Sequence, residues 1–169
     1  NQIPLNTVKA LEWSSNAYMM QIVLRMLGVQ YQQEMTLPES ASSKEMYDKL
    51  RKAFAEYGMG VKTQIDLPNE FEGYINNLFG TDKAPGGGNL LDLSFGQYDT
   101  YTPMQLAQYA STVANGGTRI SPHVVKGIYG NNDSGGLGEL QKEITGKKLN
   151  QVDITAEQMG IIKQGFYQA

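Results

Sequence analysis

One stretch of the sequence decides which fold to expect. It reads Ser94-Phe95-Gly96-Gln97-Tyr98-Asp99-Thr100-Tyr101-Thr102-Pro103-Met104-Gln105-Leu106-Ala107-Gln108-Tyr109 and continues to Ala114-Asn115-Gly116-Gly117. Within it, Thr102 can cap a helix, Pro103 suits the first helical position, and Gln105 completes a capping box. Because glycines follow at the far end, the stretch predicts a turn and then a helix from residue 103 that ends at 115–117.

Apolar residues recur at helical spacing in four other places, so the sequence predicts helices over residues 4–13, 17–27, 43–56 and 155–168. Gly28 stands where a left-handed residue would end the second of these helices. The glycine-rich residues 84–88 and the Asn- and Gly-rich residues 131–136 have the composition of turns, and they predict loops.

A strand is expected in one place, over residues 119–129, where β-branched and aromatic residues gather. A lone strand cannot form a sheet, so its partners are either hidden in the loops or lie outside the 169 residues. We favour the second interpretation. The expected fold class is therefore an α-rich piece of a larger domain, mostly helices with few strands.

The length of 169 residues fits one domain or part of one, and the composition is that of a folded protein. Seventeen acidic and fourteen basic residues give a net charge of −3, which argues against a nucleic-acid partner. No apolar run approaches the roughly 18–20 residues of a membrane span. Residues 1–4 have neither the basic nor the apolar part of a signal peptide, so no membrane contact is expected from this chain.

Cysteine is absent and histidine occurs once, at His123, which excludes thiolate chemistry and multi-histidine metal sites. His123 follows a proline at the entry to the predicted strand, and we expect it to be a surface group. Asp99 lies among turn residues and is expected to bond to nearby backbone. Any chemistry must use hydroxyls, amides, lysines or carboxylates, and neither a metal nor a cofactor is expected.

Ser14, Ser15 and Asn16 join the first two predicted helices and form the candidate site. A backbone fixed by two helices can hold two hydroxyls and a carboxamide toward a cleft. The simpler interpretation is that Ser14 or Ser15 caps the second helix, because serine is a favoured N-cap residue. The tripeptide alone leaves both interpretations open.

Three motifs, in order, resemble those of one protein family. Residues 13–18 match an S-x-N motif, and residues 65–70 resemble a G-I-D-L-P-x-E turn. The stretch quoted above resembles the G-Q…T-P-x-Q-L-A…A-N-G-G pattern of penicillin-binding protein transpeptidase domains. Residues 164–168 are similar to the helix before the last motif in class B members from Gram-positive bacteria. The sequence is therefore identified as part of a class B penicillin-binding protein of the 2B type.

The resemblance implies both a fold and a reaction. The fold is the α+β domain of transpeptidases and serine β-lactamases, with an antiparallel sheet between helices and an all-α subdomain that carries the S-x-N loop. The reaction is peptidoglycan D,D-transpeptidation, which crosslinks stem peptides ending in D-Ala-D-Ala through an acyl-serine intermediate, and β-lactams acylate the same serine. The S-x-x-K and K-[S/T]-G motifs do not occur in residues 1–169, so we expect them on either side of this part of a single transpeptidase domain. The chain alone is expected to be inactive.

The resemblance also implies roles for the S-x-N residues. Ser14 is the expected catalytic residue, a relay whose hydroxyl can protonate the leaving nitrogen because it both donates and accepts. Asn16 is expected to bind the substrate through its carboxamide. Ser15 belongs to the same substrate-binding motif, and as its variable middle residue it is expected to be mainly structural.

Other family residues are expected to shape the backbone. Gly96, Gln97, Thr102 and Pro103 identify the family, and a turn and a helix cap explain them. Gln64 departs from the family, which has glycine before Ile65 in a turn that favours a positive φ.

The implied partners are peptidoglycan stem peptides, β-lactam antibiotics and other cell-wall synthesis proteins. The implied location is the extracytoplasmic face of the cell membrane, with an N-terminal anchoring helix outside these residues. Two other functions stay open: a non-catalytic scaffold or interaction module, and a β-lactam sensor or hydrolase. Intact S-x-x-K and K-[S/T]-G motifs in the flanking sequence would favour the enzyme over the scaffold.

Overall fold

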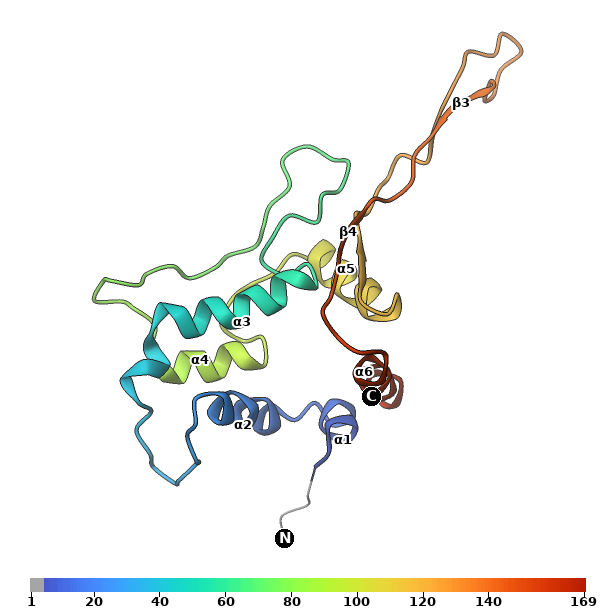
Figure 1. Cartoon of the computed structure of the whole chain (residues 1–169). Coiled ribbons are helices and arrows are strands. Elements are labelled where there is room, and N and C mark those ends of the chain that lie inside the picture. The colour runs from blue at the N-terminus through green and yellow to red at the C-terminus, as the bar shows by residue number, and fades with distance from the viewer. Residues whose placement is uncertain (1–4) are drawn as a thin grey trace.

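The structure is a computed structural model that describes residues 5–169 (Figure 1). Its helices are α1 (Thr7–Glu12), α2 (Asn16–Met26), α3 (Lys44–Glu56), α4 (Gly87–Ser94), α5 (Pro103–Ala114) and α6 (Ala156–Gln168), with a 3-10 turn η1 (Glu39–Ser42). Its strands are β1 (Thr118–Ile120), β2 (Gly127–Tyr129), β3 (Leu140–Glu143) and β4 (Lys148–Gln151). Over the described part of the chain, none of these helices has the length and apolarity to cross a membrane.

All five predicted helices form, and side-chain caps set the starts of α1, α2, α5 and α6, whereas Ser43 precedes α3 without such a bond. The Asn6 carboxamide accepts a hydrogen bond from the Lys9 N–H at 2.9 Å, so α1 begins at residue 7; the predicted start at residue 4 lies outside the described residues. The predicted capping box starts α5, with Thr102 as N-cap, and a second capping box starts α6, with Thr155 as N-cap. Gly28 follows α2 with φ +69°, as expected.

Helix α4 corrects part of the prediction of a loop at residues 84–88, because residues 84–86 are irregular and residues 87 and 88 begin the helix. Two glycines open this helix, and the Asn89 carboxamide accepts from the Gly86 N–H at 3.1 Å. A Cβ on Gly87 would lie 2.9 Å from Leu37 Cβ, so the helix can start at this contact only without a side chain. Tertiary packing overrides the weak helix propensity, because α4 supplies part of the buried core: Val23, Ala41, Tyr47, Leu90 and Leu93. In Figure 1, α4 lies between α3 and α2.

The strand prediction is correct in place but wrong in extent and in partners. Residues 121–126 separate β1 from β2, so the predicted strand over 119–129 is two short strands. Both find antiparallel partners inside the chain, β1 with β4 and β2 with β3, which overturns our preference for partners outside it. The β3 and β4 segments carry lysine, glutamine and glutamate on exposed ribbons, so their composition gives little strand signal.

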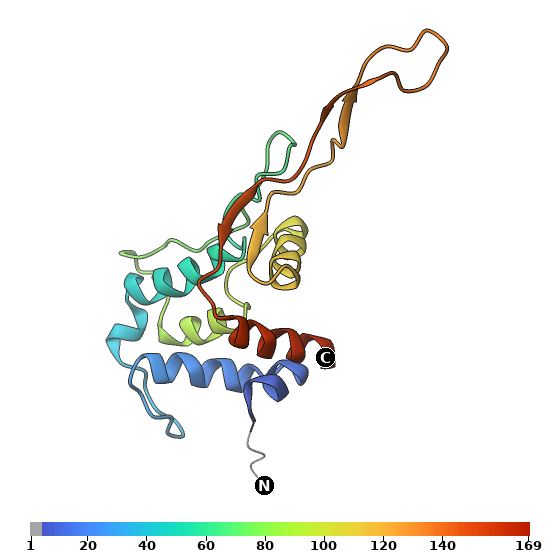
Figure 2. The same cartoon turned by 45° about the vertical axis from the view of Figure 1, so that its right-hand side comes forward.

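Residues 121–147 form an arm that extends away from the helices (Figure 2). The Asp66 carboxylate anchors its base, accepting from the N–H groups of Val124 and Val125 at 2.8 and 3.0 Å. These two hydrogen bonds lower the pKa of Asp66. The predicted turn at residues 131–136 lies at the far end of the arm, between β2 and β3.

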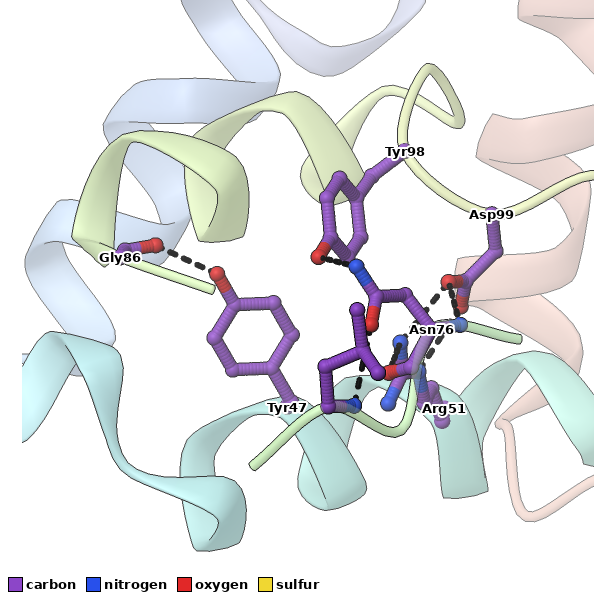
Figure 3. A network of polar contacts seen from close by, with 7 residues as sticks. Tyr47, Arg51, Asn76, Gly86, Tyr98 and Asp99 are labelled. Carbon is purple, nitrogen blue, oxygen red and sulfur yellow. Dashed lines mark hydrogen bonds and ion pairs between the residues drawn. The ribbon is translucent and has the colours of Figure 1, made fainter. Parts of the chain in front are cut away.

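Asp99 is buried and paired, which corrects the expectation that it bonds to nearby backbone. Its two carboxylate oxygens accept from Nε and Nη2 of Arg51, on α3, at 2.8 Å each (Figure 3). The same Arg51 Nη2 donates to the Asn76 carbonyl at 3.1 Å. A bidentate pair with this geometry is strong and directional. It joins α3 to the turn before α5 and to the irregular chain around Asn76.

A second buried network surrounds α5. Gln105 Nε2 donates to the carbonyls of Val61 and Glu72 at 2.8 and 2.9 Å. Gln108 Nε2 donates to the carbonyls of Thr63 and Ile120 at 3.0 and 2.8 Å, and Gln108 Oε1 accepts from Arg119 Nε at 2.9 Å. Arg119 Nη2 donates to the Lys62 carbonyl at 2.7 Å, and burial lowers the pKa of Arg119. These side chains satisfy backbone carbonyls that no helix or strand satisfies.

Gln64 adopts the conformation that the family motif reserves for glycine. Its φ is +61°, in the left-handed region. The Glu70 carboxylate fixes this turn, because it accepts hydrogen bonds from Thr63 Oγ1 at 2.6 Å and from the Gln64 N–H at 3.1 Å. The turn therefore forms without glycine, at the cost of a strained residue.

We expect Gln108→Leu to destabilise the protein. The substitution keeps the side-chain volume but leaves the buried Arg119 Nε and two carbonyls without their partner. The expected loss in the free energy of unfolding is about 2 kcal/mol or more, measured by urea unfolding. Gln164→Leu, at an exposed position of α6, is the control. Equal stability of the two variants would contradict the role of the Gln108 amide.

Gln64→Gly should act in the opposite direction. Glycine removes the left-handed strain and keeps the backbone bond to Glu70, so unfolding should cost about 0.5–1 kcal/mol more. The same change at Gln164, inside α6, should instead lower stability, because glycine disfavours a helix. A loss of stability in Gln64→Gly would show that the turn does not strain Gln64.

Candidate functional site

The candidate site is the turn between α1 and α2. The Ser14 N–H donates to the Leu11 carbonyl at 3.1 Å, and the Ser15 N–H donates to the Ala10 carbonyl at 2.9 Å. This pair of bonds is the Schellman arrangement, which places the residue after the helix C-cap in a left-handed conformation. Ser14 occupies that position with φ +49°, where glycine is usual. The turn therefore holds Ser14 in a left-handed conformation that a serine, unlike a glycine, does not favour.

Helix α2 begins immediately after this residue. Ser15 is its N-cap, and Ser15 Oγ accepts from the Tyr18 N–H at 3.3 Å. Asn16 is the first helical residue. Ser14 and Asn16 are exposed and Ser15 is partly buried, so the capping interpretation holds for Ser15, while the flanking residues face outward. A hydrogen bond of 2.9 Å between the hydroxyls of Thr7 and Tyr18 ties α1 to α2.

All three predicted residues line one cavity of about 370 Å³. Residues 94–96, from the end of α4 and the start of the quoted stretch, lie on the same cavity. Its remaining walls are apolar or aromatic and come from α1, α2, α3, α5, α6 and two irregular segments: Ala10, Leu11, Met19, Phe54, Met59, Tyr101, Tyr109 and Phe166. The structure thus brings the S-x-N turn together with the first residues of the signature stretch, which are far apart in sequence.

The charge pattern of the cavity limits its chemistry. Among the described residues that line it, none is a carboxylate, a lysine, an arginine or a histidine. Burial raises the pKa of Tyr101 to about 12 and also raises the pKa of Tyr109, so both phenols stay neutral at physiological pH. The cavity can therefore bind a polar group and pass on a proton, but these residues do not supply a base that would activate a nucleophile.

Other predicted residues lie elsewhere. His123 is exposed in the arm, and its Nδ1 lies 2.9 Å from the Val125 carbonyl oxygen, as expected for a surface group. Thr102 and Pro103 start α5 rather than line the cavity. Within residues 5–169, no three His, Cys, Asp or Glu side chains gather where they could hold a metal ion.

Sequence reasoning missed the aromatic walls of the cavity. Tyr109 and Phe166 come from α5 and α6, and their ring centroids lie 6.1 Å apart at an interplanar angle of 70°. Helical spacing predicts that one face of each helix is buried, but it does not predict which segment covers that face. Only the packing of α6 beside α5 shows that they also border the S-x-N turn.

Comparison with known proteins gives the family. Residues 1–169 match the family described as the penicillin binding protein transpeptidase domain. The chain is 47% identical over 165 residues to penicillin-binding protein 2B of Streptococcus pneumoniae, covering 98% of this chain and 23% of that protein. It is 40% identical over 163 residues to penicillin-binding protein 2A of Bacillus subtilis, covering 96% of this chain and 22% of that protein.

A solved structure agrees in three dimensions. Penicillin-binding protein 2B of S. pneumoniae superposes on this chain with a TM-score of 0.87 and 46% identity, over 98% of this chain and 26% of that one. The chain thus spans about a quarter of the length of these relatives. The chain therefore belongs to the penicillin-binding protein transpeptidase family, as a class B member of the 2B type.

Proposed function

We propose that residues 1–169 are part of the transpeptidase domain of a peptidoglycan D,D-transpeptidase, and that the α1–α2 turn is its S-x-N motif. The observation that carries this proposal is the position of Ser14 and Asn16, which both line one cavity on a turn fixed by two helices. From family membership we infer that the S-x-x-K and K-[S/T]-G motifs lie in segments beyond this chain.

The proposed reaction has two steps. The oxygen of a nucleophilic serine bonds to the carbonyl carbon of the penultimate D-Ala, the C–N bond to the terminal D-Ala breaks, and the serine proton passes to the neighbouring lysine of S-x-x-K. The leaving nitrogen takes a proton through the Ser14 hydroxyl. An amine from a second stem peptide then attacks the acyl carbon, the C–O bond to the serine breaks, and the proton lost by the amine passes to the released serine oxygen, so the crosslink forms without a cofactor.

Asn16 and Ser15 have different roles in this proposal. The Asn16 carboxamide, exposed on the cavity, has two N–H donors and one oxygen acceptor, and it can bond to a peptide amide of the substrate. The Ser15 hydroxyl already accepts the Tyr18 N–H, so its contribution to binding is to fix the start of α2 beside Asn16.

The strain at Ser14 supports a functional role. Left-handed backbone costs an ordinary residue about 1–2 kcal/mol, and such residues gather at functional sites. Glycine would relieve this strain, but it has no hydroxyl. A relay role explains why a side chain is kept at this position despite that cost.

Partners and location follow from the family. We propose that the protein binds stem peptides and β-lactams, works with other cell-wall synthesis proteins, and has its transpeptidase domain on the extracytoplasmic face of the membrane. The scaffold alternative predicts no covalent adduct with penicillin. The hydrolase or sensor alternative predicts an adduct, which a hydrolase would lose quickly.

We expect Ser14→Ala to slow acylation. The experiment labels the full-length protein, which extends beyond these residues, with a fluorescent penicillin and follows the covalent band on a denaturing gel. Loss of a proton relay should lower the acylation rate constant by about 100-fold or more. Ser134→Ala, in the exposed end of the arm, should label like the unmodified protein. Unmodified protein that is folded but takes no label would favour the scaffold.

Ser14→Gly separates strain from chemistry. It should acylate as slowly as Ser14→Ala, yet its free energy of unfolding should exceed that of Ser14→Ala by about 1 kcal/mol, because only glycine relieves the left-handed backbone. Urea unfolding of the two variants measures the difference. Equal stability would mean that the turn does not strain Ser14.

Asn16→Ala should act on binding more than on chemistry. Removal of a hydrogen-bonding carboxamide costs about 1–3 kcal/mol, which raises the dissociation constant of penicillin before acylation about tenfold. Stopped-flow labelling at several penicillin concentrations separates this constant from the acylation rate. An unchanged dissociation constant would remove Asn16 from the binding role.

A further inference from the structure

We propose that Gly165, in α6, is a positioning residue for Ser14: its missing side chain lets α1 pack closely enough to hold the S-x-N turn in place. This inference rests on the proposed function and adds a residue to which the sequence analysis assigns no role. Helices α1 and α6 lie side by side (Figures 1 and 2). Gly165 is buried and faces Leu11 of α1.

The contact leaves no room for a methyl group. A Cβ on Gly165 would lie 2.6 Å from Leu11 Cβ, 2.8 Å from Leu11 Cδ1 and 3.2 Å from Leu11 Cγ. Rotation of the Leu11 side chain can move Cδ1 away but cannot move Cβ, which is fixed to the backbone. A methyl group at residue 165 therefore displaces the backbone of α1 or α6.

Leu11 passes this displacement to the site directly. Its carbonyl accepts the Ser14 N–H at 3.1 Å, and the neighbouring Ala10 carbonyl accepts the Ser15 N–H at 2.9 Å. Both bonds define the turn that holds Ser14 at φ +49°. Because α1 is a short helix tied to α2 through Thr7 and Tyr18, a shift at Leu11 must be absorbed near the α1–α2 turn.

The same helix also shapes the cavity wall. Phe166 follows Gly165 and packs against Tyr109, and Phe166, Tyr109, Leu11 and Ser14 all line the cavity. Helix α6 thus sets both the position of the turn and the wall opposite it. Glycine inside a helix is unfavourable for helix stability, so close packing gives a physical reason for its presence here.

The chain offers a matched control within α6. Gly160 lies in the same helix, but a Cβ built on it meets no atom within 4 Å. Gly160→Ala therefore adds the same methyl group in open space. It should raise stability through helix propensity and leave acylation unchanged.

The test uses the full-length protein and measures the acylation rate constant and the dissociation constant for penicillin, with the folded fraction followed by circular dichroism. Gly165→Ala should lower the acylation rate constant by about tenfold or more, since displacements near 1 Å can cost up to about 100-fold. The dissociation constant should change less, because Asn16 belongs to α2 rather than to the α1 side of the turn.

A double-mutant cycle tests whether removal of the Leu11 side chain restores the acylation rate of Gly165→Ala. Leu11→Gly removes the three atoms nearest to the added methyl group, so Gly165→Ala should slow acylation in the Leu11 background and not in the Leu11→Gly background. If Gly165→Ala alone does not fold, the comparison of Leu11→Gly with the double variant decides: equal rates support the proposal, and a slower double variant overturns it.

The outcomes separate this inference from the proposed function. Unmodified protein without acylation would refute the proposed function and this inference with it. Normal acylation of folded Gly165→Ala would refute the positioning role alone. A similar loss in Gly160→Ala would also refute it, because the effect would then come from α6 in general and not from the contact with Leu11.

Discussion

The structure depends on hydrogen bonds that buried side chains supply to an irregular segment. Residues 61–86 contain no helix and pair with another segment only at the isolated bridge between Tyr74 and Thr100, so they leave many backbone groups to be satisfied. Arg51, Gln105, Gln108 and Arg119 donate to five carbonyls of this segment, those of Val61, Lys62, Thr63, Glu72 and Asn76. Three of these four donors come from or directly follow the signature stretch and α5. The main structural role of the stretch that identifies the family is therefore to bind residues 61–76 to the helices through hydrogen bonds.

The hydrogen bonds to residues 61–76 also position the candidate site, because α5 and the turn before it contribute to both. The Asp99–Arg51 pair fixes that turn on α3, and the same part of the chain carries Tyr101 and Tyr109 to the cavity. Helices α1 and α6 close the cavity from the other side. A strained serine can persist on the α1–α2 turn because both flanking helices are packed and tied by the Thr7–Tyr18 bond. Stability is thus concentrated in the networks around α5, and the strained residue at the candidate site is Ser14.

The sequence predicted those features that depend on local signals. Caps, prolines and glycines located the helices within a few residues, and the S-x-N tripeptide was placed on a helix junction that the structure contains. The misses came from tertiary packing. Residues 87 and 88 were assigned to a loop because they are glycines, although they begin α4, and the strand partners were missed because β3 and β4 are short and polar. Asp99 looked like a turn residue because its partner, Arg51, is far away in sequence. The contact of Gly165 with Leu11 has no sequence signal, since only the approach of two helices reveals it.

The central claim is that the α1–α2 turn faces the reacting group. A crystal structure of the full-length protein acylated by a penicillin tests this most directly, because the bound acyl group marks the reaction site. We predict that the Ser14 hydroxyl and the Asn16 carboxamide lie within hydrogen-bond distance of the acylated serine, its lysine or the bound antibiotic, with Ser14 still left-handed. An acyl group bound away from this turn, with Ser14 and Asn16 in contact with solvent alone, would contradict the account.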